Sequence, residues 1–200
     1  MVSDGGAANS KAALRRVMRQ RLASLDPDLA RQAAHRATER LLRLPDVESA
    51  AGVFTCLSFD TEIDTHEFVE GLLSAGRRVF VPRADLASHR LFVHPYPCEL
   101  EALDFGLSQP LSTEPELKPQ AIDRTIDVAV IVGLAFDRRG YRLGYGKGFF
   151  DRFLVGRPFP TIGLAYDLQV VDQLPSEPHD VPLEAVVTEL RALRPGSDGR

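Results

Sequence analysis

The chain has 200 residues, of which 44% are hydrophobic and 26% are charged, and its formal net charge is −4. These values are typical of a soluble globular protein of one domain, and the acidic charge argues against general nucleic-acid binding. The sequence has no apolar run near the roughly 18 residues that span a bilayer and only two isolated cysteines, so we expect a cytoplasmic monomer that binds neither nucleic acid nor a membrane.

Both ends of the chain are short and polar. Residues 1–9 and 193–200 are expected to be disordered tails around a single domain of residues 10–192. Ser10 suits the N-cap of a first helix that runs toward Leu25. Lys11 and Arg15 are four residues apart, so they share one face of that helix, away from its apolar stripe.

Helices alternate with short apolar segments along the rest of the chain. A second helix is predicted from about residue 28 to residue 44, where Pro45 ends it. A third helix begins at Asp64 and ends at Gly76, and a short one is predicted near residues 168–174. The segments with strand composition are residues 51–58, 78–81, 91–93, 127–132, 161–164 and 185–188.

This alternation predicts an α/β fold with a mostly parallel sheet. The strand at residues 91–93 is expected at the edge, because prolines follow it directly. Residues 97–125 are rich in proline and weakly patterned, which indicates a surface excursion. Ligands bind such sheets at the carboxyl ends of the strands. Polar clusters follow three strands, at residues 58–62, 133–151 and 166–167, which indicates an enzyme.

The segment after the strand at residues 127–132 is the most informative part of the sequence. Its glycines (Gly140, Gly144, Gly146 and Gly148) surround two cations, Arg142 and Lys147, and a carboxylate, Asp151, follows. Glycines allow backbone N–H groups to approach an anion closely. This is not a Walker A loop, because the residue after Lys147 is a glycine without a hydroxyl group. The alternative is a glycine-rich turn that binds nothing.

Residues 133–151, Gly-Leu-Ala-Phe-Asp-Arg-Arg-Gly-Tyr-Arg-Leu-Gly-Tyr-Gly-Lys-Gly-Phe-Phe-Asp, closely resemble the signature of the 5-formyltetrahydrofolate cyclo-ligase family, also called methenyltetrahydrofolate synthetases. Four further segments stand in the order of that family, so the resemblance covers roughly residues 10–190. They are Lys11-Ala-Ala-Leu-Arg15, Leu57-Ser-Phe-Asp-Thr-Glu-Ile-Asp-Thr65, Val81-Pro-Arg83 and His179-Asp180.

The resemblance implies a reaction and a fold. The reaction converts 5-formyltetrahydrofolate and ATP to 5,10-methenyltetrahydrofolate, ADP and phosphate, with Mg²⁺. The fold is a three-layer α/β/α type shared with ribose-phosphate isomerases and CoA transferases. ATP phosphorylates the poor leaving group, the formamide oxygen, and N10 of the substrate then closes the ring. In such a reaction the protein contributes mainly positioning and charge neutralisation, and no nucleophilic side chain is required.

The resemblance also implies roles for residues. Arg142 and Lys147 would act in catalysis, and Asp151 and Asp180 would bind Mg²⁺. The implied ATP-binding residues are Lys11, Arg15, Arg142, Leu143, Gly144, Tyr145, Gly146, Lys147, Gly148, Phe149 and Phe150. The implied folate-binding residues are Leu57, Glu62, Tyr145, Gly146, Lys147, Gly148 and Phe149.

The residues themselves leave other interpretations open. Lys11 and Arg15 also fit a solvated basic face of a helix. Asp151 fits a charge at a helix N-terminus, Asp180 fits a turn, and Glu62 fits a surface turn.

The chain departs from the family pattern at a few positions. Gln109 stands where bacterial relatives commonly have a glutamate, and Phe149 and Phe150 stand where tyrosines are usual. Two alternative functions stay open, and the departures at Gln109 and Phe149 bear on the first of them. One is a diverged enzyme that uses the ATP site on another substrate, and the other is a folate- or nucleotide-binding protein without turnover.

Overall fold

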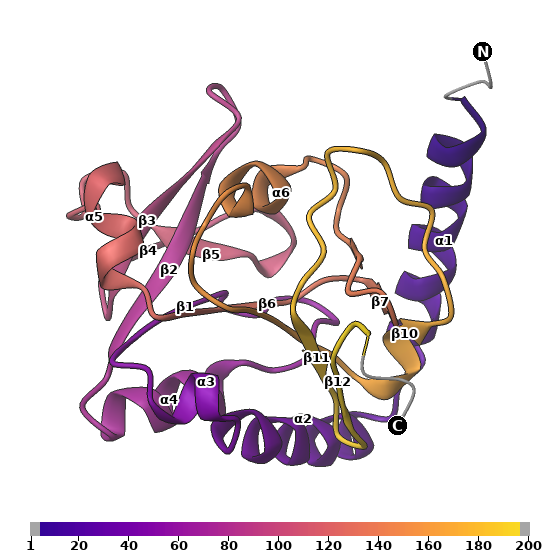
Figure 1. Cartoon of the computed structure of the whole chain (residues 1–200), viewed down its shortest axis with the longest axis horizontal. Helices are drawn as coiled ribbons and strands as arrows, with labels where there is room; N and C mark the ends of the chain where they lie inside the picture. The colour runs from indigo at the N-terminus through magenta and orange to yellow at the C-terminus, as the bar shows by residue number, and fades with distance from the viewer. Residues whose placement is uncertain (1–4, 197–200) are drawn as a thin grey trace.

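The computed structural model describes residues 5–196 (Figure 1). Within them, a seven-stranded sheet has the strand order β12-β11-β9-β6-β1-β2-β3. The strands are β1 (Gly52–Thr55), β2 (Arg78–Asp85), β3 (Arg90–Tyr96), β6 (Val128–Ile131), β9 (Thr161–Leu164), β11 (Ala185–Val187) and β12 (Ala192–Leu193). The inner strands are parallel, whereas β3 and β12 pair antiparallel at the two edges. The predicted α/β fold and the edge position of residues 91–93 are confirmed.

Helices cover both faces of this sheet. The helices α1 (Gly5–Ala23), α2 (Pro27–Leu42), α3 (Pro45–Glu48) and α4 (His66–Ser74) share one hydrophobic cluster, and α5 (Pro119–Thr125) and α6 (Phe149–Leu154) share another. Successive side chains of a strand point to opposite faces. In β1, Val53 therefore belongs to the first cluster and Phe54 to the second. Figure 1 shows α2, α3 and α4 below the sheet and α6 above it, in three layers.

Residues 97–125 are more structured than the sequence predicts. They form a hairpin of β4 (Leu100–Ala102) and β5 (Ser108–Pro110), a 3₁₀ turn at Asp104–Gly106, and helix α5. Ile122 is buried in the second cluster, so the end of this segment is core rather than surface. The prolines weaken the local pattern, and only packing against the sheet stabilises these short elements.

The prediction of a helix near residues 168–174 is wrong. A 3₁₀ turn at Asp167–Gln169 leads into strand β10 (Val170–Val171), which forms a small second sheet with β7 (Ala135–Asp137) and β8 (Arg142–Leu143). The side chain of Gln169 accepts a hydrogen bond from the Tyr166 N–H at 2.8 Å and donates one to the Gly133 carbonyl at 2.6 Å. These buried bonds hold the turn against the glycine-rich segment, and local helix propensity does not include them.

The predicted ends of the domain also change. Helix α1 begins at Gly5 rather than at Ser10, and β12 extends the sheet to Leu193. Alanines at positions 7 and 8 favour an earlier helix start, and pairing with β11 draws in the residues of β12. The rest of the predicted tails, residues 1–4 and 197–200, lies outside the described residues. Within the described part, none of the helices has the length and apolar character required to cross a bilayer.

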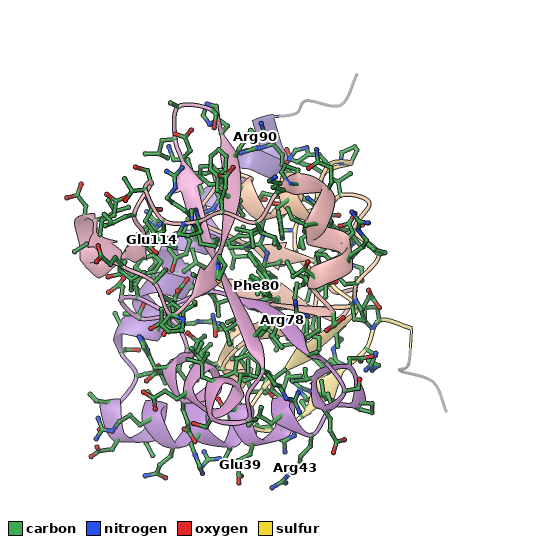
Figure 2. All side chains as sticks on the ribbon, turned by 90° about the vertical axis from the view of Figure 1, so that its left-hand side faces the viewer. Glu39, Arg43, Arg78, Phe80, Arg90 and Glu114 are labelled. Atoms are coloured by element: carbon green, nitrogen blue, oxygen red, sulfur yellow. The ribbon has the colours of Figure 1, made fainter. Side chains whose placement is uncertain are left out.

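The strands β2 and β3 continue beyond the sheet as a hairpin, which we call the β2–β3 arm (residues 82–92). Within it the strands stay paired from Arg83 and Phe92 to Asp85 and Arg90. Figure 2 shows Arg90 near the far end of this arm, and Glu39 and Arg43 of α2 at the opposite end of the molecule. The arm therefore projects away from the α2 layer, on the side of the molecule where α6 lies (Figure 1).

Candidate active site

A cavity of about 1300 Å³ lies beyond the carboxyl ends of β1, β2 and β6. Its walls come from α1, from the loop after β1, from the β2–β3 arm, from the glycine-rich segment and from residues 177–180. The structure thus brings together every segment that carries the family resemblance. Residues 166 and 167 do not line it, contrary to the convergence expected from the sequence. The carboxylate of Asp167 instead pairs with Arg191 at 2.8 Å.

The buried side chain of Asp137 determines the shape of the glycine-rich segment. Its carboxylate accepts hydrogen bonds from the backbone N–H groups of Arg139, Tyr141 and Leu174, at 2.9, 3.0 and 2.9 Å. These bonds turn the chain so that β8 pairs with β7 and Arg142 enters the cavity wall. Further along, Gly146 and Gly148 have φ values of +96° and +63°. Both values favour glycine, because a side chain is strained in that region.

Arg142 is a buried cation in the cavity wall. Its side chain is 5% exposed, and its guanidinium lies 3.5 Å from a carboxylate oxygen of Asp151 and 5.0 Å from the ring centre of Phe150. Burial lowers the pKa of Arg142, and the negative charge of Asp151 opposes that shift. A buried guanidinium held between a carboxylate and a ring has little freedom, so it is positioned in advance for an anion.

Lys11 and Arg15 of α1 are fixed by partners far away in the sequence. The Lys11 ammonium lies 2.5 Å from Glu177 Oε2 and 2.7 Å from Asp180 Oδ2. Burial acts against its charge, but the hydrogen bonds and charges of Asp180 and Glu177 raise the pKa of Lys11 above its usual value. Arg15 donates to the Gly144 carbonyl at 2.9 Å. A solvated helix face therefore does not describe these two residues.

Carboxylates gather at the rim beside Lys11. One oxygen of Asp151 accepts from the Val181 N–H at 3.4 Å, which brings the residue next to Asp180. Glu177, His179 and Asp180 each offer a ligand atom, and these atoms lie within 4.8 Å of one another. Sequence reasoning missed Glu177, and named His179 only as part of the resemblance. The signal that it could have used is the short spacing of Glu177, His179 and Asp180 in one loop.

Glu62 is a second buried ionisable residue in the cavity wall. Its carboxylate accepts from the Tyr145 hydroxyl at 3.0 Å and from the Phe59 N–H at 3.3 Å. Burial raises the pKa of Glu62 to about 7. The rings of Phe59 and Tyr145 are 5.5 Å apart, and Arg19 lies over the Tyr145 ring at 5.5 Å. Glu62 is therefore not the exposed turn residue of the alternative interpretation.

The remaining predicted residues line the same cavity. Leu57, Lys147 and Phe149 all contribute to its walls. Lys147 is exposed and forms no ion pair within residues 5–196. Phe150 packs edge-on against Phe54 at 6.5 Å, so this ring belongs partly to the core.

Gln109 has a structural explanation. Its buried amide oxygen accepts from the Ala84 N–H at 3.0 Å, and its amide nitrogen donates to Glu101 at 3.0 Å. The side chain thus joins the β4–β5 hairpin to the β2–β3 arm. A glutamate at this position would lose the donor and place a second negative charge beside Glu101.

We therefore predict that Gln109→Glu lowers the free energy of unfolding by about 1–3 kcal/mol. In this variant two carboxylates, which both accept hydrogen bonds, would face each other where Gln109 now donates to Glu101. Urea unfolding monitored by circular dichroism measures this change. The double variant Gln109→Glu with Glu101→Gln restores a donor and an acceptor, so it should recover most of the loss. An unchanged unfolding midpoint in Gln109→Glu would contradict the prediction.

Comparisons with known proteins identify the family of the chain. A model described as the 5-formyltetrahydrofolate cyclo-ligase family matches residues 7–189. A 5-formyltetrahydrofolate cyclo-ligase of Escherichia coli K12 is 36% identical over 178 residues, which cover 86% of this chain and 96% of that protein. One of Mycolicibacterium smegmatis is 37% identical over 132 residues, which cover 62% of this chain and 66% of that protein.

The fold is also similar to that of a solved structure. The NMR structure of Aquifex aeolicus 5,10-methenyltetrahydrofolate synthetase superposes with a TM-score of 0.78 at 26% identity, and the match covers 95% of this chain and 94% of that one. Both the sequence match and the structural match extend over nearly the whole domain. The chain therefore belongs to the 5-formyltetrahydrofolate cyclo-ligase family.

Proposed function

We propose that this protein is an ATP-dependent ligase that converts 5-formyltetrahydrofolate to 5,10-methenyltetrahydrofolate in one-carbon metabolism. The observation that carries the proposal is the single cavity of about 1300 Å³, which joins a cation-rich glycine loop to the buried carboxylate of Glu62. Pockets for one small ligand usually measure roughly 300–1000 Å³. The cavity is thus large enough for a nucleotide and a folate side by side.

The cations would bind the phosphates of ATP. Arg15, Arg142 and Lys147 line the cavity, and so do residues 143–150, whose backbone N–H groups would also contact phosphate. The formyl oxygen of the substrate attacks the γ-phosphorus, and the bond to ADP breaks. Negative charge on the transferring group is stabilised by the fixed guanidinium of Arg142 and by the ammonium of Lys147.

The folate would lie on the other side of the same loop. Glu62, beside Leu57, would accept hydrogen bonds from the donor-rich edge of the pterin, and residues 145–149 would contact its flat face. The cavity then holds N10 near the activated carbon. N10 attacks this carbon and loses its proton, and the carbon–oxygen bond breaks as phosphate leaves. Positioning alone supplies much of the acceleration in such a ring closure.

The acidic rim fits Mg²⁺. Carboxylate oxygens are the ligands that this ion prefers, and Asp151 and Asp180 both offer them at the cavity. The ammonium of Lys11 between Asp180 and Glu177 indicates that a positive charge is favourable there. When bound, Mg²⁺ supplies charge neutralisation on the phosphates of ATP.

We infer further that the protein acts as a cytoplasmic monomer without a nucleic-acid or membrane partner. Its two cysteines are free thiols, one of them buried, as is usual in a reducing compartment. Its net charge of −4 disfavours general binding to nucleic acid. Size-exclusion chromatography with light scattering checks the mass, for which a monomer gives 22.0 kDa.

One assay separates the three candidate functions. Purified protein is mixed with 5-formyltetrahydrofolate and MgATP, and the near-ultraviolet absorbance of methenyltetrahydrofolate is followed. Its appearance supports the cyclo-ligase. Phosphate release without that absorbance would favour a diverged enzyme, and tight binding without either would favour a binding protein.

Lys147→Ala should lower kcat/KM about tenfold or more, because a charge-assisted hydrogen bond to phosphate contributes about 1.5–3 kcal/mol. The fold should be unaffected, since Lys147 is exposed. The assay above and a thermal melt measure both effects. Lys118→Ala is the matched control, because Lys118 is exposed and does not line the cavity. Full activity of Lys147→Ala would remove this residue from the mechanism.

A further inference from the structure

Part of the cavity wall has no role in the proposed chemistry. This wall, which we call the arm wall, is formed by the β2–β3 arm and the β4–β5 hairpin, and it is built mainly from apolar side chains such as Pro82, Leu91, Leu103 and Leu107. The Gln109 amide connects its two parts through Ala84 and Glu101. The arm and the hairpin are therefore held together by hydrogen bonds, and they extend the cavity away from α1.

Arg83 is the one positively charged residue in the described part of the arm wall. Its guanidinium lies over the ring of Phe92, its partner across the β2–β3 pairing, at 4.8 Å. Its Nε is buried and has no hydrogen-bond partner within residues 5–196. A buried donor without an acceptor is costly, so the folded chain leaves this cation incompletely paired.

The carboxylates nearby do not neutralise Arg83 by an ion pair. Asp85 lies in the same wall, but its carboxylate accepts from the Ser88 hydroxyl at 2.6 Å and the Ala87 N–H at 3.1 Å in its own turn. Asp104 is exposed. His94 also lies beside Arg83, and burial together with the Arg83 charge lowers its pKa. This favours the neutral ring, and a histidine supplies no negative charge in either form. The guanidinium thus lies over the Phe92 ring and forms no ion pair within residues 5–196, and the charge of Asp85 acts on it only at longer range.

We propose that Arg83 binds a carboxylate of the glutamate tail of the folate substrate. This inference rests on the proposed function, which places the pterin at Glu62 and the reacting formyl group at the glycine loop. The tail is at the far end of the substrate, and it carries the carboxylates. A planar guanidinium suits a carboxylate because it can donate two parallel hydrogen bonds. The apolar side chains around it would contact the aminobenzoate ring that precedes the tail.

The test compares two substrates and three variants. The substrates are 5-formyltetrahydrofolate and 5-formyltetrahydropteroate, which has the same pterin and aminobenzoate but lacks the glutamate. Arg83→Met keeps the aliphatic packing on Phe92, and Arg83→Ala removes it. Arg90→Ala is the matched control, because Arg90 lies over the same ring at 5.9 Å but does not line the cavity.

Arg83→Met and Arg83→Ala should each raise KM for 5-formyltetrahydrofolate about tenfold or more, as expected for loss of one charged hydrogen bond. KM for the pteroate and KM for ATP should not change, and Arg90→Ala should resemble the wild type on both substrates. A merely structural role would raise both folate KM values equally. That result, an effect on ATP alone, or no effect on 5-formyltetrahydrofolate would each overturn the proposal.

Equilibrium binding separates this inference from the proposed function. Calorimetric titration of the two folates without ATP measures their Kd values whether or not turnover occurs. If the wild type binds 5-formyltetrahydrofolate more tightly than the pteroate and Arg83→Met abolishes that difference, Arg83 binds the tail even in a protein without ligase activity. If the wild type turns over but does not distinguish the two substrates, the proposed function stands and the role of Arg83 fails.

Discussion

Replacing Arg142 by alanine is expected to lower kcat/KM by about 100-fold or more, which is the size of effect seen when a fixed donor to a developing negative charge is removed. The guanidinium is 5% exposed and lies between Asp151 and the ring of Phe150. Water cannot easily replace it there. The rise in KM should be larger for ATP than for the folate, because Arg142 would contact phosphate.

The same change should also destabilise the protein. Asp151 would lose its cation at a position where its side chain is 16% exposed, and a buried charge without a partner is unfavourable. Arg142→Lys keeps the charge but not the planar fork, so it should recover stability more fully than activity. Thermal melts and steady-state kinetics of the two variants measure these effects.

Arg43→Ala is the control for a lost arginine. Arg43 follows directly after α2, at the opposite end of the molecule from the β2–β3 arm (Figure 2), and its side chain is 78% exposed. Its activity and melting temperature should equal those of the wild type. If Arg142→Ala is folded and fully active, the glycine loop does not stabilise the transferring phosphoryl group.

Glu62→Gln is expected to stabilise the protein at pH 8 and to weaken folate binding there. Burial raises the pKa of Glu62 from 4.5 to about 7 in the folded protein. Below pH 4.5 the carboxyl group is protonated in both states and no penalty arises. As the pH rises from 4.5 to 7, Glu62 ionises in the unfolded chain but stays protonated in the folded protein, so the folded state loses stability. Above pH 7 the full penalty of about 3 kcal/mol remains.

Glutamine is neutral at every pH, so the variant should escape this penalty. Its melting temperature should exceed that of the wild type at pH 8 and approach it at pH 4.5. Binding should change in the opposite direction, because the ionised carboxylate is the better acceptor for pterin donors. In the wild type, the Kd of 5-formyltetrahydrofolate should therefore fall as the pH rises through about 7, and Glu62→Gln should lose this dependence.

Melts and calorimetric titrations at several pH values test both halves of the prediction. Glu70→Gln is the matched control, because Glu70 is exposed and does not line the cavity. A Glu62→Gln variant that is less stable than the wild type at pH 8 would show that the cost of burying the ionised Glu62 carboxylate does not dominate its effect on stability. Unchanged folate affinity would show that the pterin does not bind there.

Local sequence was sufficient for much of the architecture and for the motif itself. The strands β1, β6, β9 and β11 were predictable because an apolar, β-branched run between turn residues has few alternatives. The glycine-rich segment was recognisable because Gly146 and Gly148 adopt backbone conformations that other residues avoid. Their spacing from Arg142, Lys147 and Asp151 is a property of the chain, and it carries the family resemblance.

Contacts between distant residues were not predictable in this way. Lys11 meets Glu177 and Asp180 across 166 and 169 positions of the sequence. The role of Gln109, which joins Ala84 and Glu101 by hydrogen bonds, is visible only in the folded β4–β5 hairpin. The turn at Asp167–Gln169 replaced a predicted helix because the Gln169 amide bonds to Gly133.

The sequence by itself determined the order of the secondary-structure elements, the glycine loop and the family, because backbone preferences and motif spacing are local. The tertiary structure alone decided which charges are buried and what they face. Glu62 has a raised pKa, Arg142 pairs with Asp151, and Arg83 has a buried Nε without a hydrogen-bond partner, because segments from different parts of the chain exclude water around them. Desolvation depends on which segments pack around a charge in three dimensions, and this packing cannot be deduced from local sequence patterns.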